Sequence, residues 1–238
     1  TLFDRFNFQV DKGEFVSIIG SNGSGKTTLL NILCGSLPIE GGSITFGGRD
    51  ITRMKEYQRA AFIGRVFQDP AMGSCSNLTI LENMALADSK KGTYGLGRAI
   101  NKKRLDHYRS LLETCGMGLE NRLQVQVGSL SGGQRQALAL VLANMTDIDL
   151  LILDEHTAAL DPKSSRTIME LTDKLVRERG VTTLMVTHNL RFALEYGSRL
   201  VMMHQGTCVK DLKGEDKRNA SIDDLLTTFN EISIECGN

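Results

Sequence analysis

The chain has 238 residues, of which 41% are apolar and 24% are charged, the composition of an ordinary globular protein with a substantial core. Its 28 Lys and Arg residues balance 28 Asp and Glu residues, so the formal net charge is zero. This balance argues against a nucleic-acid-binding protein, in which a basic excess normally supplies the affinity for phosphates, although it does not exclude a local basic patch.

Cysteine usage and apolar runs place further limits on the protein. The 5 cysteines include no CxxC pair, so we expect neither a disulfide framework nor a zinc site, and a reducing cytosol fits best. No apolar run approaches the ~20 residues needed to cross a bilayer, and the sequence predicts no signal peptide. If the protein works at a membrane, we therefore expect another chain to cross it.

Strand-like and helical segments alternate along the chain. Short apolar runs predict strands at 15–19, 43–46, 63–67, 150–153, 182–186 and 200–203. The helical spacing of apolar residues predicts helices at 26–33, 79–86, 102–115, 134–144, 164–177 and 189–196. This alternation predicts an α/β fold with short buried strands in a largely parallel sheet.

The predicted elements divide the chain, interpreted as one domain over 1–238, into three parts. Residues from about 71–144 show helical patterns and no convincing strand, so we expect a helical lobe inserted into an α/β core of about 1–70 and 145–215. Within the lobe, residues 89–104 are rich in Lys, Arg and Gly, which fits either a solvated loop or a contact with anionic headgroups or a membrane partner. The tail from about 216–238 is amphipathic at 221–229 and predicts a C-terminal helix on the core.

The segment between the first predicted strand and helix has the pattern of a phosphate-binding loop. Its sequence, GSNGSGKT at 20–27, matches G-x-x-x-x-G-K-[ST] in the strand–loop–helix context that this motif requires. Gly20, Gly23 and Gly25 let the backbone curl so that its amides face phosphate oxygens, and the helix N-terminus adds partial positive charge. Lys26 is expected to reach the β- and γ-phosphates, and the Thr27 hydroxyl to ligate Mg²⁺.

Two other interpretations of this loop fit the sequence less well. A glycine-rich turn could merely join the strand to the helix, but the full pattern is rare by chance. A dinucleotide-binding fingerprint needs a third small residue at position 28, where Thr28 stands, and gives Lys26 no role. We therefore predict binding of a nucleoside triphosphate.

A second glycine-rich helix start, LSGGQ at 130–134, precedes the helix predicted at 134–144. Ser131 can cap that helix, while Gly132 and Gly133 allow a phosphate to approach the backbone. Glycine-rich caps are common, so in isolation this segment fits a plain helix cap equally well. If it binds a phosphate, it is a second anion site in the same chain.

The apolar strand LLIL at 150–153 ends in Asp154 and Glu155. A phosphate-binding loop needs a carboxylate that holds Mg²⁺. Ligands of open parallel sheets bind at the carboxyl ends of the strands, which is where Asp154 and Glu155 stand. Adjacent residues of a strand point to opposite sides, which permits different roles. We expect Asp154 to support the metal, through a bound water, and Glu155 to align and deprotonate the attacking water; a merely polar strand end is the alternative.

Together these segments resemble the ATP-binding subunit of an ABC transporter over nearly the whole chain. In the terms of that family, 20–27 is Walker A, Gln68 in VFQDP is the Q-loop, LSGGQ is the signature, LLILDE is Walker B, AALD at 158–161 is the D-loop, and His188 in VTHN is the switch histidine. The resemblance implies a RecA-like P-loop NTPase core with an inserted α-helical subdomain. It also implies a head-to-tail dimer, with ATP held between Walker A of one subunit and the signature of the other.

The resemblance assigns ATP and Mg²⁺ as cofactors and gives roles to individual residues. The residues expected to contact the nucleotide are Gly20, Ser21, Asn22, Gly23, Ser24, Gly25, Lys26, Thr27, Thr28, Gln68, Ser131, Gly132, Gly133 and Gln134, the signature residues acting on the opposing site. Thr27 and Gln68 are expected to ligate Mg²⁺, with Asp154 supporting it. Glu155 is the expected general base, and His188 is expected to position the γ-phosphate and water. Asp161 is expected to communicate between the two sites.

Two features depart from the family pattern. Relatives stack adenine on an aromatic residue whose position falls before Thr1, while Phe3 and Phe6 stand too close to Walker A and are expected to pack in a strand. His156 follows Glu155 where many relatives have proline. Protonation of His156 could tune the site, but we expect a structural variant there.

Three segments, GRVFQDPAMG, DEHTAALDPK and TTLMVTHN, resemble a narrower group, the ATPases of bacterial importers of tryptophan or tyrosine. Such systems pair the ATPase with a permease and a substrate-binding lipoprotein. The expected function is ATP hydrolysis coupled to aromatic amino-acid uptake, by two identical or paired ATPase subunits bound peripherally to the cytoplasmic face of the cell membrane. A permease helix is expected to dock between Gln68 and about Met84, with Met72, Cys75 and Leu78 lining the groove, unless these residues only pack a loop.

Other classes of P-loop protein fit the sequence less well. A soluble ABC ATPase that is not coupled to transport is the main alternative. DNA-acting members need a long coiled-coil insertion, for which the spacing of about 100 residues between Walker A and the signature leaves no room. Ribosome-acting members usually carry two ATPase units in one chain. P-loop kinases and GTPases lack LSGGQ.

Overall fold

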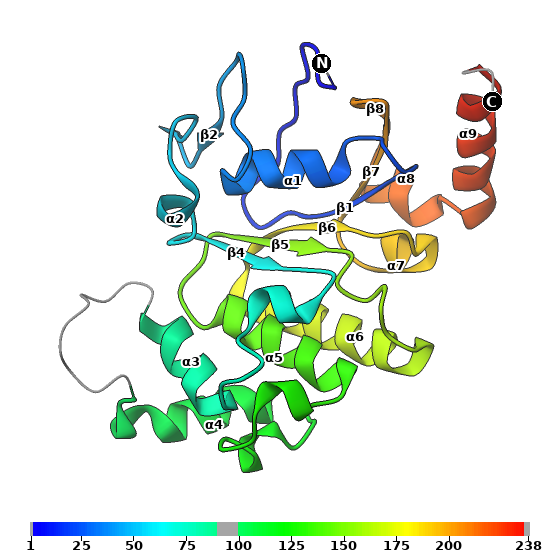
Figure 1. Ribbon diagram of the computed structural model, residues 1–238. Coiled ribbons are helices and arrows are strands. Elements are labelled where there is room, and N and C mark those ends of the chain that lie inside the picture. The colour runs from blue at the N-terminus through cyan, green and yellow to red at the C-terminus, as the bar shows by residue number, and fades with distance from the viewer. Residues whose placement is uncertain (1, 90–99, 236–238) are drawn as a thin grey trace. The chain divides into compact units, whose positions relative to one another are not determined.

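The structure is a computed structural model that describes residues 2–89 and 100–235 (Figure 1). Residues 90–99 of the basic segment fall outside this description. Two compact units account for the chain, unit 1 formed by residues 1–60 with 180–238 and unit 2 by residues 61–179. The predicted division into core, helical lobe and tail stays a prediction. None of the helices in the described residues combines the length and apolar character that a membrane span requires.

Unit 1 is built on four strands that lie side by side. In spatial order they are β6 (Thr182–Val186), β1 (Phe15–Gly20), β7 (Arg199–His204) and β8 (Thr207–Lys213). The first three are parallel and β8 runs antiparallel to β7. Every residue of β1 is buried, as expected of a central parallel strand covered on both faces. A short hairpin of β2 (Thr45–Phe46) and β3 (Arg49–Asp50) forms a separate sheet.

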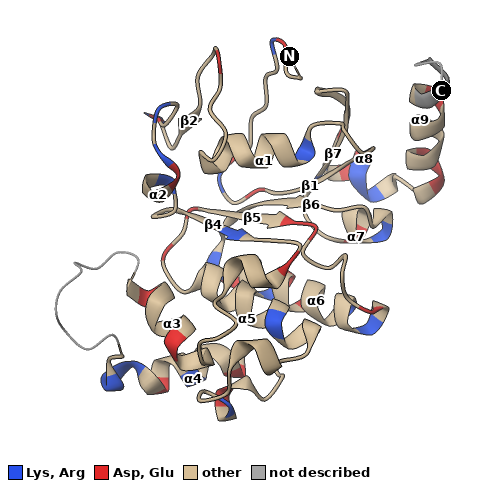
Figure 2. Cartoon of the chain, viewed as in Figure 1, with Lys and Arg blue, Asp and Glu red and all other residues tan. Residues whose placement is uncertain are grey.

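Five helices lie in the described part of unit 1. They are α1 (Lys26–Cys34), α2 (Glu56–Arg59), α7 (Leu190–Glu195), α8 (Gly214–Asn219) and α9 (Ile222–Glu235). Both α1 and α7 contact β1, from opposite sides in Figure 1. The helix predicted at 221–229 is confirmed as α9, whose Leu225 is fully buried in a cluster with Ile19 and Met202. Its first turn carries Asp223 and Asp224, whose negative charges interact favourably with the positive N-terminal end of the helix dipole (Figure 2).

Unit 2 combines a parallel strand pair with a group of helices. The strands are β4 (Ile63–Val66) and β5 (Leu150–Asp154), and the helices are α3 (Ile80–Asp88), α4 (Leu105–Glu113), α5 (Gly132–Asn144) and α6 (Pro162–Arg179). The α5 helix packs against β4, α3, α4 and α6, and nearly all of its residues after the first turn are buried (Figure 1). The largely apolar segment 137–143 therefore forms the centre of this unit.

Most predicted elements are confirmed, with three kinds of difference. The predictions included no counterpart of β8, because most of its side chains are exposed and form no apolar run. The helix predicted at 102–115 begins with a short 3₁₀ turn, Lys102–Arg104, capped by Asn101, and α4 starts only at Leu105. The expectation that Phe3 and Phe6 pack in a strand is wrong: both lie in irregular backbone, where their rings contact each other with centroids 4.8 Å apart.

A buried arginine fixes the segment that carries the phosphate-loop helix. The Arg59 guanidinium donates five hydrogen bonds, all to backbone carbonyls of unit 1: Ile32, Leu33, Ile51, Thr52 and Met54. Two of these acceptors lie in the last turn of α1, whose carbonyls have no partner within the helix. Arg59 thus satisfies the end of α1 and ties it to the loop after β3.

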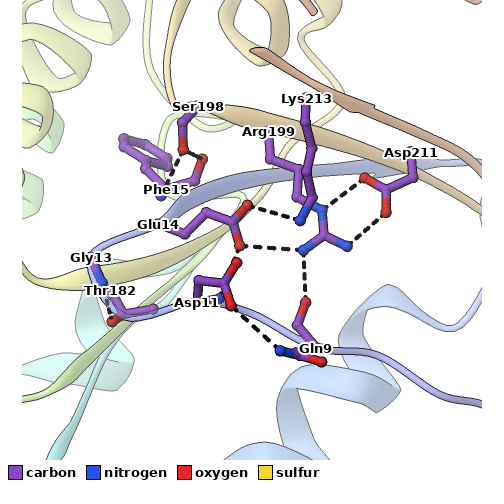
Figure 3. A network of polar contacts seen from close by, with 10 residues as sticks. All are labelled: Gln9, Asp11, Gly13, Glu14, Phe15, Thr182, Ser198, Arg199, Asp211 and Lys213. Atoms are coloured by element: carbon purple, nitrogen blue, oxygen red, sulfur yellow. Dashed lines mark hydrogen bonds and ion pairs between the residues drawn. The ribbon is translucent and has the colours of Figure 1, made fainter.

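A second arginine joins the N-terminal segment to β7 and β8 (Figure 3). Arg199 forms two bonds of 2.7 Å with the carboxylate of Asp211, donates to the Gln9 carbonyl, and lies 3.2 Å from Glu14 Oε2. Lys213 adds a longer contact of 3.5 Å to Glu14. Because Glu14 directly precedes β1, this network holds the entry of the central strand.

Candidate nucleotide-binding site

The phosphate loop of unit 1 runs from the end of β1 to the start of α1. Gly23 and Gly25 have φ values of 78° and 104°, the left-handed region in which a side chain is strained. Lys26 is only 5% exposed, and its Nζ donates to the carbonyls of Gly20 at 2.8 Å and Ser21 at 2.9 Å. The ammonium group therefore lies across the mouth of its own loop, at the place where the sequence predicts phosphate oxygens.

The start of the loop leaves no room for a side chain at position 20. A Cβ added to Gly20 would lie 2.3 Å from the Met203 carbonyl oxygen and 2.7 Å from Ser24 Oγ. Ser24 Oγ is buried without a hydrogen-bond partner among the described residues, a condition that ordinarily costs about 1–3 kcal/mol. The Gly206 amide donates to the Ser24 carbonyl at 3.0 Å, which anchors the loop to the β7–β8 turn. An oxygen-rich anion would give this hydroxyl an acceptor.

His188 lies near the start of this loop within unit 1. A cavity of about 260 Å³ is lined on its polar side by Gly20, Ser21, Thr187 and His188, and on its apolar side by Ile19, Leu190, Leu226 and Phe229. The short link after β6 is held rigidly, because the Thr187 amide donates to Ile18 and Asn189 caps α7. The structure thus brings the predicted switch histidine to the loop that precedes Lys26.

In unit 2, β5 delivers Asp154 and Glu155 at its carboxyl end, as the sequence predicts. Asp154 is buried, and its Oδ2 lies 2.7 Å from Arg65 Nη2 on the neighbouring strand β4. Glu155 adopts φ 48°, in the left-handed region, and its carbonyl accepts from the Ala158 amide at 2.9 Å. The sequence predictions missed Arg65; its signal is a lone charge inside the apolar run at 63–67.

His156, which replaces the proline of many relatives, belongs to the core. It is only 2% exposed, and its Nε2 lies 3.3 Å from Thr172 Oγ1 on α6. Burial lowers the pKa of His156 to about 4, so the imidazole is neutral at physiological pH. This environment is that of a packed structural residue, as expected from the sequence.

Gln68 follows β4 in a segment that several side chains hold in place. The Phe67 carbonyl accepts from Gln136 Nε2 of α5 at 3.3 Å. Asp69 caps the 3₁₀ helix Pro70–Gly73 by accepting from the Ala71 amide. Asn83 of α3 then pairs with the backbone of Cys75 in both directions, at 2.7 and 3.0 Å.

The signature segment forms the N-terminus of α5. Ser131 accepts from the Gln134 amide at 3.3 Å and its own amide donates to Gln134 Oε1 at 3.2 Å, so the predicted cap is confirmed and forms a reciprocal capping box. Added Cβ atoms at Gly132 and Gly133 would only reach van der Waals contact with Leu160 and Ser164. Packing among the described residues therefore does not require glycine at either position.

Asp161 connects the D-loop to the start of α6, next to the signature. Its carboxylate accepts from the amides of Lys163 and Ser164, both at 3.1 Å. Bonding to Ser164 lowers the pKa of Asp161 below its ordinary value. The charge of Asp161 is thus engaged at the N-terminus of α6, where it also favours the helix dipole.

The predicted site residues fall into two groups, one in each unit. Unit 1 holds the phosphate loop, from Gly20 through Asn22, Thr27 and Thr28, together with His188. Unit 2 holds Gln68, Asp154, Glu155 and the signature. Phe3 lies beside the phosphate loop, since a Cβ added to Gly25 would lie 3.0 Å from its ring.

Comparison with known proteins agrees with this geometry. Residues 3–158 match the family model described as ABC transporter. The chain is 47% identical over 231 residues to a tyrosine transport ATP-binding protein of Clostridioides difficile, covering 96% of this chain and 91% of the relative. It is 39% identical over 208 residues to the sulfate/thiosulfate import ATP-binding protein CysA 2 of Chromobacterium violaceum, covering 87% of this chain and 53% of that relative.

Solved structures give the same family. A nucleotide-free ATP-binding cassette from an ABC transporter matches with a TM-score of 0.80 and 27% identity, over 100% of this chain and 93% of that one. The dimeric post-hydrolysis state of the cassette MJ0796 bound to ADP and Pi matches with a TM-score of 0.76 and 29% identity, over 89% and 90% of the two chains. The chain therefore belongs to the ABC transporter family, as an ATP-binding subunit with an ATPase fold and activity.

Proposed function

We propose that two copies of this chain, or this chain and a paired ATPase subunit, bind ATP head to tail and couple its hydrolysis to a membrane permease that imports an aromatic amino acid. The observation that carries the proposal is the phosphate loop, where a buried Lys26 and the unpartnered Ser24 hydroxyl face a backbone shaped by glycines. A buried cation and a buried free hydroxyl are both stabilised by a phosphate.

The nucleotide contacts follow from this loop. The amides of 20–28 and Lys26 bind the phosphates, and His188, which lines the same cavity as Gly20 and Ser21, positions the γ-phosphate and the water. Glu155 removes a proton from that water, as a carboxylate at the end of a buried strand can. ATP and water are converted to ADP and phosphate.

The chain also offers oxygen ligands for Mg²⁺. The proposed donors are the Thr27 hydroxyl, the Gln68 amide oxygen and the Asp154 carboxylate, the hard ligand types that this ion prefers. The buried Ser24 hydroxyl, three residues before Thr27 in the same loop, fits a site that takes up a phosphate together with its cation. When bound, Mg²⁺ would neutralise charge on the phosphate oxygens. Thr27, Gln68 and Asp154 are the residues that would hold that cation.

The signature explains why two ATPase subunits are needed. The 13-residue helix α5 begins at Gly132 and is capped by Ser131. Because Gly132 and Gly133 have no side chains, they leave the positive N-terminal end of the helix accessible. In the proposed dimer this helix end contacts the γ-phosphate bound by the other subunit. The solved cassette structures that match this chain include dimers, one of them bound to ADP and Pi.

Aromatic amino-acid uptake rests on the relatives. The tyrosine transport ATP-binding protein shares 47% identity, against 39% for a sulfate/thiosulfate import protein and 34% for a phosphonates import protein. The proposed partners are a permease and, through it, a substrate-binding lipoprotein, which places the ATPase at the cytoplasmic face of the membrane. The names of these relatives give no support to an ABC ATPase that is uncoupled from transport.

The proposed contact with the permease is the surface around the segment after Gln68. Met72 is 69% exposed, Cys75 is exposed, and Leu78, which precedes α3 in the chain, is half-buried. A permease helix could bury these apolar side chains. The Asn83 bonds to Cys75 connect this surface to α3.

Replacing Lys26 by alanine tests the phosphate loop. We expect the affinity for a fluorescent ATP analogue to fall by about tenfold or more, because the loop loses its full positive charge. Equilibrium fluorescence titration measures the change. The exposed Lys12 of the same unit, replaced by alanine, is the matched control and should leave the affinity unchanged. Wild-type affinity in Lys26→Ala would contradict the phosphate-loop assignment.

Replacing Ser131 by arginine tests the shared site. The bulky cation would obstruct the helix end, so we expect ATP-dependent dimerisation in a Glu155→Gln background to be lost on a sizing column. Ser131→Arg also removes a helix cap, at a cost of about 1 kcal/mol. Ser221→Arg removes the equivalent cap of α9 and controls for that cost. An intact ATP-dependent dimer in Ser131→Arg would count against the head-to-tail arrangement.

A further inference from the structure

No step of the proposed function uses the ion pair between Arg65 and Asp154. Arg65 lies on β4 and Asp154 at the end of β5, and the two strands pair in parallel with Arg65 opposite Ile152. Nη2 of the arginine lies 2.7 Å from Oδ2 of the carboxylate, and the side chains are only 14% and 12% exposed. This is a short, largely buried, charge-assisted contact on the carboxylate proposed to support Mg²⁺.

A guanidinium and a divalent cation compete for the same carboxylate. Both are attracted by the single negative charge of Asp154, and they repel each other at close range. Asp154 Oδ2 already accepts a hydrogen bond from the Arg65 guanidinium. A cation that uses this carboxylate must therefore displace the guanidinium or share the carboxylate with it at an electrostatic cost.

Arg65 contacts an aromatic ring while it pairs with Asp154, and it can keep this contact when the carboxylate is released. Its guanidinium carbon lies 4.6 Å from the centre of the Phe67 ring, within cation–π distance. Phe67 directly precedes Gln68, and its carbonyl accepts from Gln136 of α5. Arg65 therefore contacts both the carboxylate of Asp154 and the residue next to Gln68.

We propose that Arg65 is a positioning residue: it neutralises and holds Asp154 when no metal is present, yields the carboxylate to the metal that arrives with the nucleotide, and so sets how strongly nucleotide affinity depends on that metal. This inference rests on the proposed role of Asp154 in binding Mg²⁺. It adds a competitor for that ion from within the chain.

The test compares nucleotide affinity with and without metal in neutral variants of Arg65. The probe is a fluorescent, non-hydrolysable ATP analogue, titrated once with excess Mg²⁺ and once with EDTA. In Arg65→Gln the unpaired Asp154 charge repels the metal-free triphosphate, while the metal no longer meets a competitor. We expect the ratio of the EDTA dissociation constant to the Mg²⁺ dissociation constant to rise by about tenfold relative to wild type.

A second neutral variant and a matched control support the comparison. Arg65→Met keeps a long, unbranched aliphatic side chain without the charge and carries the test if Arg65→Gln does not fold, with the same expected rise. Arg65→Lys keeps the positive charge and should restore a ratio near the wild-type value. Arg177→Gln removes an exposed arginine that pairs with Asp173 in the same unit, and should leave the ratio unchanged.

The Asp154→Asn background separates action through Asp154 from direct contact with the nucleotide. If Arg65 acts through the carboxylate, adding Arg65→Gln to Asp154→Asn leaves the ratio unchanged. A wild-type ratio in the folded Arg65→Gln and Arg65→Met proteins would overturn the inference, as would an equal rise in both backgrounds. Loss of all nucleotide binding in the wild-type protein would instead overturn the proposed function.

Discussion

ATP hydrolysis is expected to fall by roughly 10²–10⁴-fold when Glu155 is replaced by glutamine, while nucleotide affinity stays close to wild type. Glutamine has the size of glutamate but cannot take a proton from water at neutral pH. The backbone at this position has φ 48°, which both side chains tolerate equally, so the substitution leaves the end of β5 in place. Buried His156 and the Ala158 bond continue to hold the turn.

Single-turnover hydrolysis under saturating Mg-ATP is the measurement that isolates this step. Glu178→Gln is a suitable control, because Glu178 is exposed near the end of α6 and has no role in the proposed site. The variant should also form a longer-lived ATP-bound dimer, visible on a sizing column. Unchanged turnover in Glu155→Gln would remove this residue as the general base and leave only a structural role at the strand end.

The free energy of unfolding is expected to fall by about 3 kcal/mol when Arg199 is replaced by methionine, the low end of the cost of breaking a buried ion pair. Arg199 is 7% exposed and Glu14 is 12% exposed, so the Glu14 carboxylate loses its guanidinium partner and keeps the hydrogen bond from the Asp11 amide and the longer Lys213 contact (Figure 3). Asp211 is 44% exposed and can regain water, so its share of the cost is small. The Gln9 carbonyl also loses its donor.

Urea denaturation followed by circular dichroism provides the measurement. Arg218→Met is the matched control, because Arg218 and Glu215 are 74% and 86% exposed and 3.8 Å apart; it should change stability by less than about 0.5 kcal/mol. Arg199→Lys should lie between wild type and Arg199→Met, since a lysine cannot bond Asp211 twice and reach Gln9 as well. Equal stability of Arg199→Met and wild type would mean that this network contributes nothing to the entry of β1.

The fold could be predicted where burial leaves a mark on the sequence. Strand β6 was predicted with its observed bounds, and β1 to within a residue, because continuous apolar runs follow from burial on both faces. Strand β8 carries no such mark, since most of its side chains face solvent and its pairing is decided by β7. The helix α2, Glu56–Arg59, is too short to show a helical period, and its buried residue is a charged one.

The candidate site could be predicted as motifs but not as contacts. Glycines of the phosphate loop stand at positions that require their conformational freedom, and this requirement is visible in the sequence. The pairing of Arg65 with Asp154 joins residues 89 positions apart and depends on the register of β4 against β5. Likewise, the cavity shared by Gly20, His188 and Phe229 arises only when three distant segments fold together.

The position of Lys26 has a consequence for the speed of nucleotide capture. Its ammonium group bonds the carbonyls of Gly20 and Ser21, so contacts within the chain itself hold the curve of the backbone. A binding surface that is shaped in advance loses little conformational entropy when it is filled. If phosphate oxygens replace these two carbonyls as acceptors of the Lys26 ammonium, little of the loop has to become ordered, and we expect nucleotide association to be fast.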